Sequence, residues 1–151
     1  MLFEFKKIVS LQIMGRIVAL DYGKKRTGIA VSDPLRMVAG GLTTLPSKET
    51  IGFLKQYTAD NPVDMFVLGD PRQMNYEDSE NRGRVLKFKE NLRQSFPGIE
   101  IQMFDERFTT LLAHQAMIRG GLKKKDRQNK ALVDKLSATI LLQSFLEANK
   151  V

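Results

Sequence analysis

The order of apolar segments along the chain restricts its possible folds more than any other feature of the sequence. Residues 16–21 and 27–32 are apolar and flank a short turn, which predicts two strands in an antiparallel hairpin. Three further strands are predicted at 37–45, 63–69 and 99–104, and helices are predicted at about 48–59, 78–96, 110–118 and 130–148. Early strands followed by alternating helices and strands predict an α/β fold, with a five-stranded mixed sheet flanked by helices.

Local signals refine two of these elements. Ser47 stands just before the first predicted helix and is expected to be its N-cap. The long helix over 78–96 carries an apolar stripe that should face the sheet, formed by Val85, Phe88, Leu92 and Phe96.

Composition limits the number of domains and the classes of function. The 151 residues are 42% hydrophobic, so we expect one domain over 14–151 with one core, preceded by an extension at 1–13. Cysteine is absent and His114 is the single histidine, which excludes disulfides, thiolate zinc sites and histidine-rich metal sites. No apolar run reaches the ~20 residues of a membrane span, and the N-terminus lacks the order of a secretory signal. A cytoplasmic protein without a membrane partner is therefore expected.

Three acidic residues are attached to elements of the predicted core. Asp21 and Glu106 each follow an apolar strand, and Asp134 lies in the apolar C-terminal helix. A buried carboxylate costs free energy unless something pairs with it, and a divalent cation could serve all three because hard cations take oxygen ligands. The loops after residues 69 and 104 should also meet at one sheet edge, where ligands bind in open α/β sheets.

The helical position of Asp134 can be expressed as an angle. At about 100° per residue, Asp134 shares an arc of roughly 80° with apolar residues of the same helix, and Ser137 lies mostly on the other side. The apolar residues on that arc are Ala131, Ala138, Leu141, Leu142 and Phe145. Asp134 should therefore face the protein body. Stabilisation by the helix dipole, or a pair with Lys135, is the alternative explanation.

Four motifs in order resemble those of the YqgF (RuvX) family of RNase H-like proteins. They span residues 16–147, and no single one is specific. The motifs are Leu20-Asp21-Tyr22-Gly23-x3-Thr27-Gly28-Ile29-Ala30, Gly69-x-Pro71, Asp105-Glu106-Arg107-Phe108-Thr109-Thr110 and Val133-Asp134-x2-Ser137-Ala138. The resemblance implies an RNase H-like fold and a nuclease in the maturation of pre-16S ribosomal RNA, in a family related to Holliday-junction resolvases.

Carried over by position, the resemblance assigns Asp21, Glu106 and Asp134 as an acidic set that binds Mg²⁺ or Mn²⁺. The hypothesis is that Asp21 bridges two metal ions while Glu106 and Asp134 each complete one side. The family has an apolar residue where this chain has Asp70, which could join the metal site or cap the following loop. Strand alternation alone does not choose between Asp105 and Glu106, and the resemblance favours Glu106.

The net charge of +7 suits a polyanionic partner such as nucleic acid, although a basic protein without such a partner is the alternative. The expected phosphate contacts are Lys24, Lys25 and Arg26 on the hairpin turn, Arg72 and Arg107 after two strands, and Lys123, Lys124 and Lys125 in a basic loop. A solvated charge run is the alternative for that loop. The expected partners are pre-16S rRNA and the small ribosomal subunit, with the protein a monomer or homodimer.

Other functions would use the same residues differently. A Holliday-junction resolvase would employ the same acids in a dimer on branched DNA. An RNA- or ribosome-associated protein with an inactive site is the non-enzyme alternative. The first motif also resembles the phosphate loop of actin-like ATPases and sugar kinases, but those enzymes need two such domains and 151 residues provide one.

Overall fold

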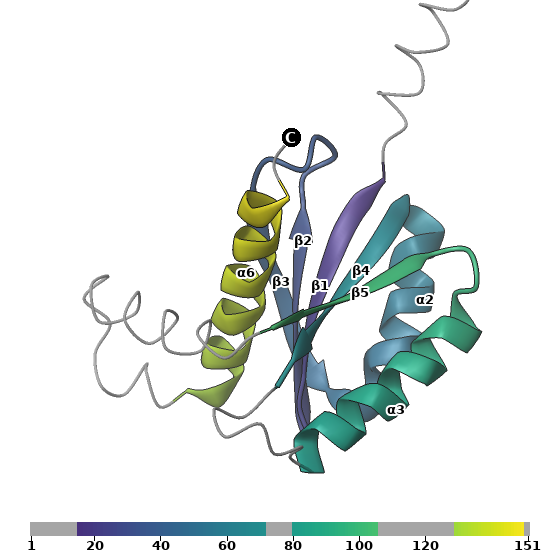
Figure 1. Ribbon diagram of the computed structural model, residues 1–151, viewed down its shortest axis with the longest axis vertical. Coiled ribbons are helices and arrows are strands. Elements are labelled where there is room, and N and C mark those ends of the chain that lie inside the picture. Colours follow the sequence, from purple (N-terminus) through teal and green to yellow (C-terminus); the bar gives the residue numbers. More distant parts are fainter. Residues whose placement is uncertain (1–14, 72–79, 106–128, 150–151) are drawn as a thin grey trace, which may run out of the picture.

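The computed structural model describes residues 15–71, 80–105 and 129–149. In this part of the chain, five strands form one sheet, with helix α6 on one face and helices α2 and α3 on the other (Figure 1). The elements are β1 Arg16–Tyr22, β2 Arg26–Ser32, β3 Ala39–Pro46, the 3-10 turn η1 Ser47–Glu49, α2 Thr50–Asp60, β4 Val63–Asp70, α3 Glu80–Ser95, β5 Glu100–Asp105 and α6 Lys130–Ala148.

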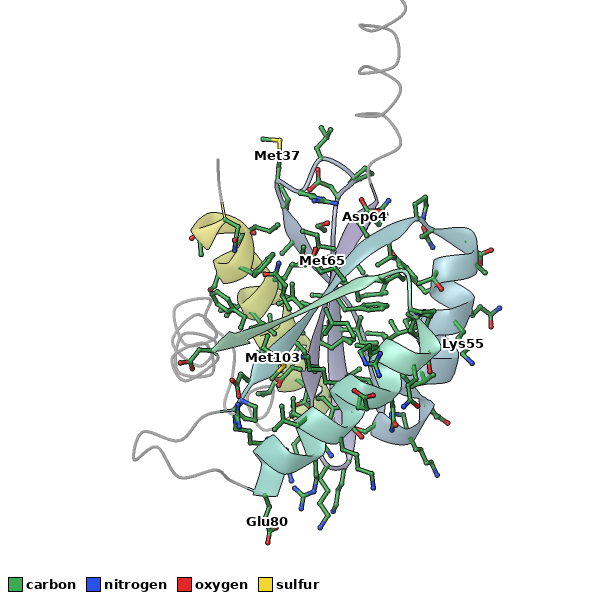
Figure 2. The ribbon with its side chains drawn as sticks, turned by 45° about the vertical axis from the view of Figure 1, so that its right-hand side comes forward. Met37, Lys55, Asp64, Met65, Glu80 and Met103 are labelled. Atoms are coloured by element: carbon green, nitrogen blue, oxygen red, sulfur yellow. The ribbon has the colours of Figure 1, made fainter. Side chains whose placement is uncertain are left out.

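The sheet is mixed, as the order of elements predicts. Its strands lie in the order β3-β2-β1-β4-β5, with antiparallel pairs in β1–β2–β3 and parallel pairs in β1–β4–β5. The parallel strands β1, β4 and β5 therefore have their C-terminal ends at the same end of the sheet. We call this end of the sheet the carboxyl edge. Figure 2 shows Asp64 and Met37 at the opposite end of the sheet from Glu80, where α3 begins.

The core on the α2–α3 face forms because alternate residues of each strand are apolar. Val18 and Leu20 of β1 point into this core, where they meet the apolar stripe of α3. That stripe is buried as predicted, with Val85, Phe88, Leu92 and Phe96 all below a tenth exposed. Phe66 of β4 packs edge-to-face on Phe96 with ring centroids 5.2 Å apart, which fixes the end of α3 against the sheet.

The core on the α6 face uses smaller side chains from the sheet. Ala19 and Ala30 lie under Ala138, Leu141 and neighbouring residues of the helix. At Gly41 of β3, an added Cβ would lie 2.9 Å from both Lys135 Cγ and Thr139 Oγ1, so the helix lies close to the strand. Small residues in β1, β2 and β3 therefore allow α6 to approach the antiparallel half of the sheet.

The buried side of α6 differs from the predicted arc at two residues. Ser137 is buried with 5% of its surface exposed, whereas Ala131 is exposed. The reason is that α6 lies mainly over β2 and β3, which turns its buried side towards Ser137. The first turn of α6 lies beside β3, the edge strand of the sheet. There the carbonyl oxygen of Ala131 accepts a hydrogen bond from Thr44 Oγ1 at 2.6 Å.

Among the helices that the structure describes, none has the length and apolar character needed to cross a membrane.

Candidate functional site

Asp21 lies near the end of β1, on the face of the sheet that α6 covers. It shares a face of the strand with Ile17 and Ala19, which belong to the core beneath α6. Its cross-strand partner in β2 is Gly28. On the other side Leu20 pairs with Leu68, so the next residue of β4 in that register is Gly69. The half-buried Asp21 carboxylate is therefore flanked in its row by two residues that have no side chain.

Asp134 reaches the same place from α6. A Cβ at Gly28 would overlap the carbonyl oxygen of Asp134, so the helix backbone rests directly on the partner of Asp21. The Cα atoms of antiparallel partners lie about 4.5–5.5 Å apart. Asp21 and Asp134 are therefore neighbours at the carboxyl edge, although most of the chain separates them in sequence.

Asp134 forms an ion pair with Arg26, the first residue of β2. Arg26 Nε donates to Asp134 Oδ2 at 3.0 Å, and the two side chains are 36% and 26% exposed. Lys135, the other cation that could pair with Asp134, instead has its side chain alongside Gly41 of β3. Arg26 thus places a positive charge next to Asp134. We call Asp21 and Asp134 together the acidic site.

The hairpin turn before Arg26 is held in a defined conformation. Gly23 N–H donates to the carbonyl of Arg26 at 2.9 Å, and Ser47 N–H donates to the carbonyl of Lys25 at 2.9 Å. Ser47 Oγ also donates to the carbonyl of Gly23 at 2.5 Å. The exposed Lys24 and Lys25 therefore project from an anchored turn beside the acidic site.

The prediction that Ser47 caps a helix is wrong. Its side chain makes no capping hydrogen bond, because Ser47 lies inside η1 and α2 begins only at Thr50. The hydroxyl is buried against the hairpin turn instead, where it shares a 2.9 Å hydrogen bond with Thr27 Oγ1.

We expect Ser47→Ala to lower the free energy of unfolding by about 1–2 kcal/mol, because buried Thr27 loses a hydrogen-bond partner and the turn loses an anchor. Urea unfolding of the variant measures this loss. Ser47→Thr retains the hydroxyl and should restore part of the stability. Equal stability of wild type and Ser47→Ala would show that the hydroxyl does not hold the turn.

Asp70 has a different environment from Asp21. It shares a face of the strand with Phe66 and Leu68, which point into the core beneath α2 and α3. Arg82 of α3 donates to Asp70 Oδ1 from Nε at 3.0 Å, and the Asp70 side chain is only 9% exposed. The geometry therefore connects Asp70 to α3, on the face of the sheet opposite Asp134.

We expect Asp70→Asn to retain metal-dependent cleavage and to lower the free energy of unfolding by roughly 1–3 kcal/mol, because a hydrogen bond between charged groups is weakened. Cleavage rates at saturating Mn²⁺, measured beside urea unfolding, separate the two effects. Loss of cleavage in a variant that stays folded would instead assign Asp70 to the metal site.

The remaining predicted site residues lie outside the described part of the chain. These are Glu106, Arg72, Arg107, Lys123, Lys124 and Lys125. Within the described part, no cluster of three or more acidic or histidine residues could hold a metal ion. Strand β5 shows on which face of the sheet Asp105 lies. Phe104 is on the α6 face, whereas Asp105 is on the opposite face and pairs in register with Asp70.

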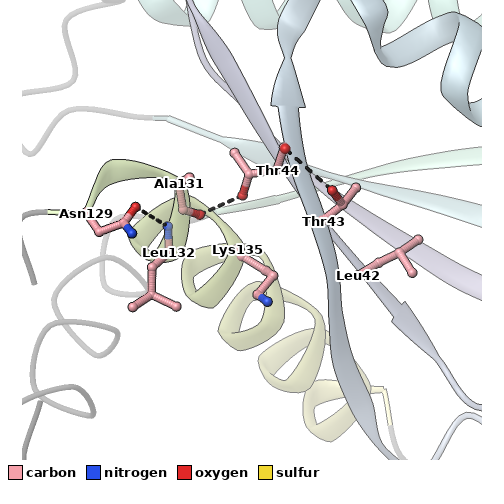
Figure 3. Close-up of a pocket in the computed structure, with 7 residues that line it drawn as sticks. All are labelled: Leu42, Thr43, Thr44, Asn129, Ala131, Leu132 and Lys135. Atoms are coloured by element: carbon pink, nitrogen blue, oxygen red, sulfur yellow. Dashed lines mark hydrogen bonds between the residues drawn. The ribbon is translucent and has the colours of Figure 1, made fainter. Parts of the chain in front are cut away.

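An open groove of about 330 Å³ runs between β3 and the first turns of α6 (Figure 3). Lys135 lines it, and Figure 3 shows the hydrogen bond from Thr44 to Ala131 that crosses it. Asn129 caps the helix here by accepting a hydrogen bond from Leu132 N–H at 3.2 Å. The groove thus combines polar and apolar side chains, with Lys135 as its charged lining residue.

Comparison with known proteins identifies the family to which the chain belongs. A family model described as "RuvX: Holliday junction resolvase" matches residues 15–148. The chain belongs to the RuvX family. The assignment agrees with the four sequence motifs, which fall within the same range.

Relatives of this RuvX chain are similar over nearly their whole length. A protein of Phocaeicola vulgatus named "Putative pre-16S rRNA nuclease" is 55% identical over 137 residues, which cover 91% of this chain and 99% of that one. A protein of Azobacteroides pseudotrichonymphae with the same name is 58% identical over 134 residues, covering 89% and 97%.

A solved structure gives the fold of the chain. Thermus thermophilus RuvC in complex with a Holliday junction substrate superposes with a TM-score of 0.50 at 19% identity, over 89% of this chain and 94% of that one. The α/β chain has the RNase H-like fold of RuvC, as the sequence motifs predicted.

Proposed function

We propose that the chain is a metal-dependent nuclease that cleaves phosphodiester bonds at the 5′ end of pre-16S rRNA in the cytoplasm. The observation that carries the proposal is the close approach of the Asp134 backbone to Gly28, the cross-strand partner of Asp21. Membership of the RuvX family and the names of the relatives support the reaction and the substrate.

The donor chemistry of the site fits Mg²⁺ or Mn²⁺. Carboxylate oxygens are the ligands that these hard cations prefer, and magnesium needs only one or two of them when substrate oxygens and water complete its shell. Asp21 and Asp134 would hold the cation together with Glu106. The side-chain directions of β5 support Glu106 over Asp105 as the ligand. Asp105 lies on the same face of the sheet as Asp70, opposite the face of Phe104 that α6 covers. When bound, such cations activate water and stabilise the oxygens of a phosphodiester displacement.

Basic side chains around the acids would position the nucleic acid. Lys24, Lys25 and Arg26 project from the anchored hairpin turn, and Lys135 lines the groove beside α6. Contacts of this kind hold phosphates without reading the base sequence, so specificity for a processing site would come from RNA structure or from the small ribosomal subunit. Arg72, Arg107 and Lys123, Lys124 and Lys125 are proposed to extend this basic surface.

Resolution of Holliday junctions is the second candidate function. The printed description of the RuvX family favours it, and it would use the same carboxylates. It differs in requiring a homodimer that engages branched DNA, whereas cleavage of an RNA end can be carried out by a monomer.

The deciding experiment compares cleavage of a labelled pre-16S RNA end, a precursor small-subunit particle and a four-way DNA junction, each with Mg²⁺ and Mn²⁺. Wild type should cleave the RNA or the particle, and Asp134→Asn should not. Cleavage of the junction alone would replace the proposal with the resolvase function. RNA binding without cleavage of any substrate would support an RNA-binding protein instead.

A further inference from the structure

We infer that Arg26 occupies the Asp134 carboxylate in the metal-free protein and leaves it when a divalent cation binds. The inference rests on the proposed metal site and adds a competitor to it. Arg26 Nε holds Asp134 Oδ2 at 3.0 Å, so a guanidinium occupies one of the oxygens proposed for the metal. Arg26 thus affects metal binding through its ion pair with Asp134.

The two positive charges compete for the same carboxylate. The guanidinium balances the negative charge of the Asp134 carboxylate, and a divalent cation on the same group would be repelled by it as long as Arg26 stayed in place. Binding of the cation therefore favours displacement of Arg26. In the metal-free state, Arg26 in turn relieves the cost of holding Asp134 in a partly buried place near Asp21.

The local structure allows the Arg26 side chain to move while its backbone stays in place. The backbone is fixed by the bond from Gly23 N–H to the Arg26 carbonyl and by the adjacent bond from Ser47 N–H to the Lys25 carbonyl. The side chain, in contrast, is 36% exposed at the surface of the sheet edge. Once displaced, the guanidinium lies on the same anchored turn as Lys24 and Lys25, and it becomes available to bind a phosphodiester through its forked donors.

The test measures Mn²⁺ binding without substrate, by electron paramagnetic resonance of unbound Mn²⁺ and by the thermal shift that Mn²⁺ produces. Wild type is compared with Arg26→Ala, and with Arg26→Gln in case alanine impairs folding. Lys24→Ala is the matched control, because it removes one positive charge from an exposed side chain of the same turn. Asp134→Asn tests the metal site itself.

We expect both Arg26 variants to bind Mn²⁺ about fivefold more tightly than wild type, the size expected for loss of a partly exposed ion pair. Their thermal shift with Mn²⁺ should also be larger, and Lys24→Ala should remain close to wild type. Equal tightening in Lys24→Ala and Arg26→Ala would overturn the inference, because it would reflect general charge only. Unchanged or weaker binding in the Arg26 variants would also overturn it.

A separate result would identify failure of the proposed function. If wild type bound no Mn²⁺, or if Asp134→Asn bound it as wild type does, the carboxylate metal site would be wrong and the competition inferred from it would fall with it. If wild type bound Mn²⁺ tightly, and the binding depended on Asp134 but not on Arg26, the inference about Arg26 would be wrong and the proposed metal site would stand.

Discussion

Replacing Asp21 with asparagine is expected to abolish metal-dependent cleavage and to leave a folded protein. The asparagine keeps the shape of the side chain between Gly28 and Gly69 but removes the negative charge that a divalent cation requires. Because metal ions supply several kcal/mol of transition-state stabilisation, we expect the cleavage rate to fall about 100-fold or more. Initial rates at saturating Mn²⁺ measure the loss, and circular dichroism with urea unfolding verifies the fold.

The matched control for Asp21→Asn is Asp105→Asn, which makes the same chemical change at the end of another strand. Asp105 is exposed and lies in register with Asp70, so we expect this variant to retain cleavage. Full cleavage by Asp21→Asn would remove Asp21 from the metal site. Loss of cleavage in Asp105→Asn would instead move the third ligand from Glu106 to Asp105.

The elements of the fold could be predicted from the sequence because their signals are local. Residues 63–69 are apolar apart from Asp64 and have the length of a strand, and they form β4, which is buried from Phe66 onward. The stripe in 78–96 repeats at helical spacing, so the buried face of α3 follows directly from the order of residues. The short turn after Asp21 likewise predicts the antiparallel β1–β2 pair.

The partners of the polar side chains could not be predicted, because they depend on distant contacts. Arg26 and Asp134 are 108 positions apart, and nothing near either residue indicates the pair. Ser47 has the local pattern of a helix cap, yet the turn carbonyl of Gly23 competes for its hydroxyl. The Asp70 sequence context suggests a metal ligand as readily as a loop cap, and only the strand register shows that it faces Arg82.

The glycines next to Asp21 have a role that sequence alone leaves open. Gly28 lies within the first family motif, but a glycine in a strand could equally mark a bulge or a turn. The structure gives the physical reason for Gly28, which is that the backbone of Asp134 lies where a Cβ would be. The spacing between strand and helix, and not the flexibility of glycine, therefore requires the absence of a side chain.

Gly28→Ala is accordingly expected to lower stability and activity together. The added methyl group would overlap the carbonyl oxygen and carbon of Asp134. These are backbone atoms of α6, so they cannot rotate away as a side chain could. Overpacking of this kind costs about 1–3 kcal/mol, and a backbone clash should reach the upper end of that range. Relief of the clash requires α6 to move away from β2, which carries Asp134 away from Asp21. We therefore expect weaker Mn²⁺ binding and slower cleavage in the molecules that remain folded.

The control makes the same substitution where the structure has room for it. Gly83 is exposed in α3, and a Cβ there would meet nothing within 4 Å, so Gly83→Ala should raise the free energy of unfolding by about 0.5–1 kcal/mol. Urea unfolding and Mn²⁺ titration of both variants should thus give opposite changes in stability and a metal-binding defect in Gly28→Ala alone. Wild-type Mn²⁺ affinity in Gly28→Ala would contradict the close packing of α6 on β2 as the feature that brings the two aspartates together.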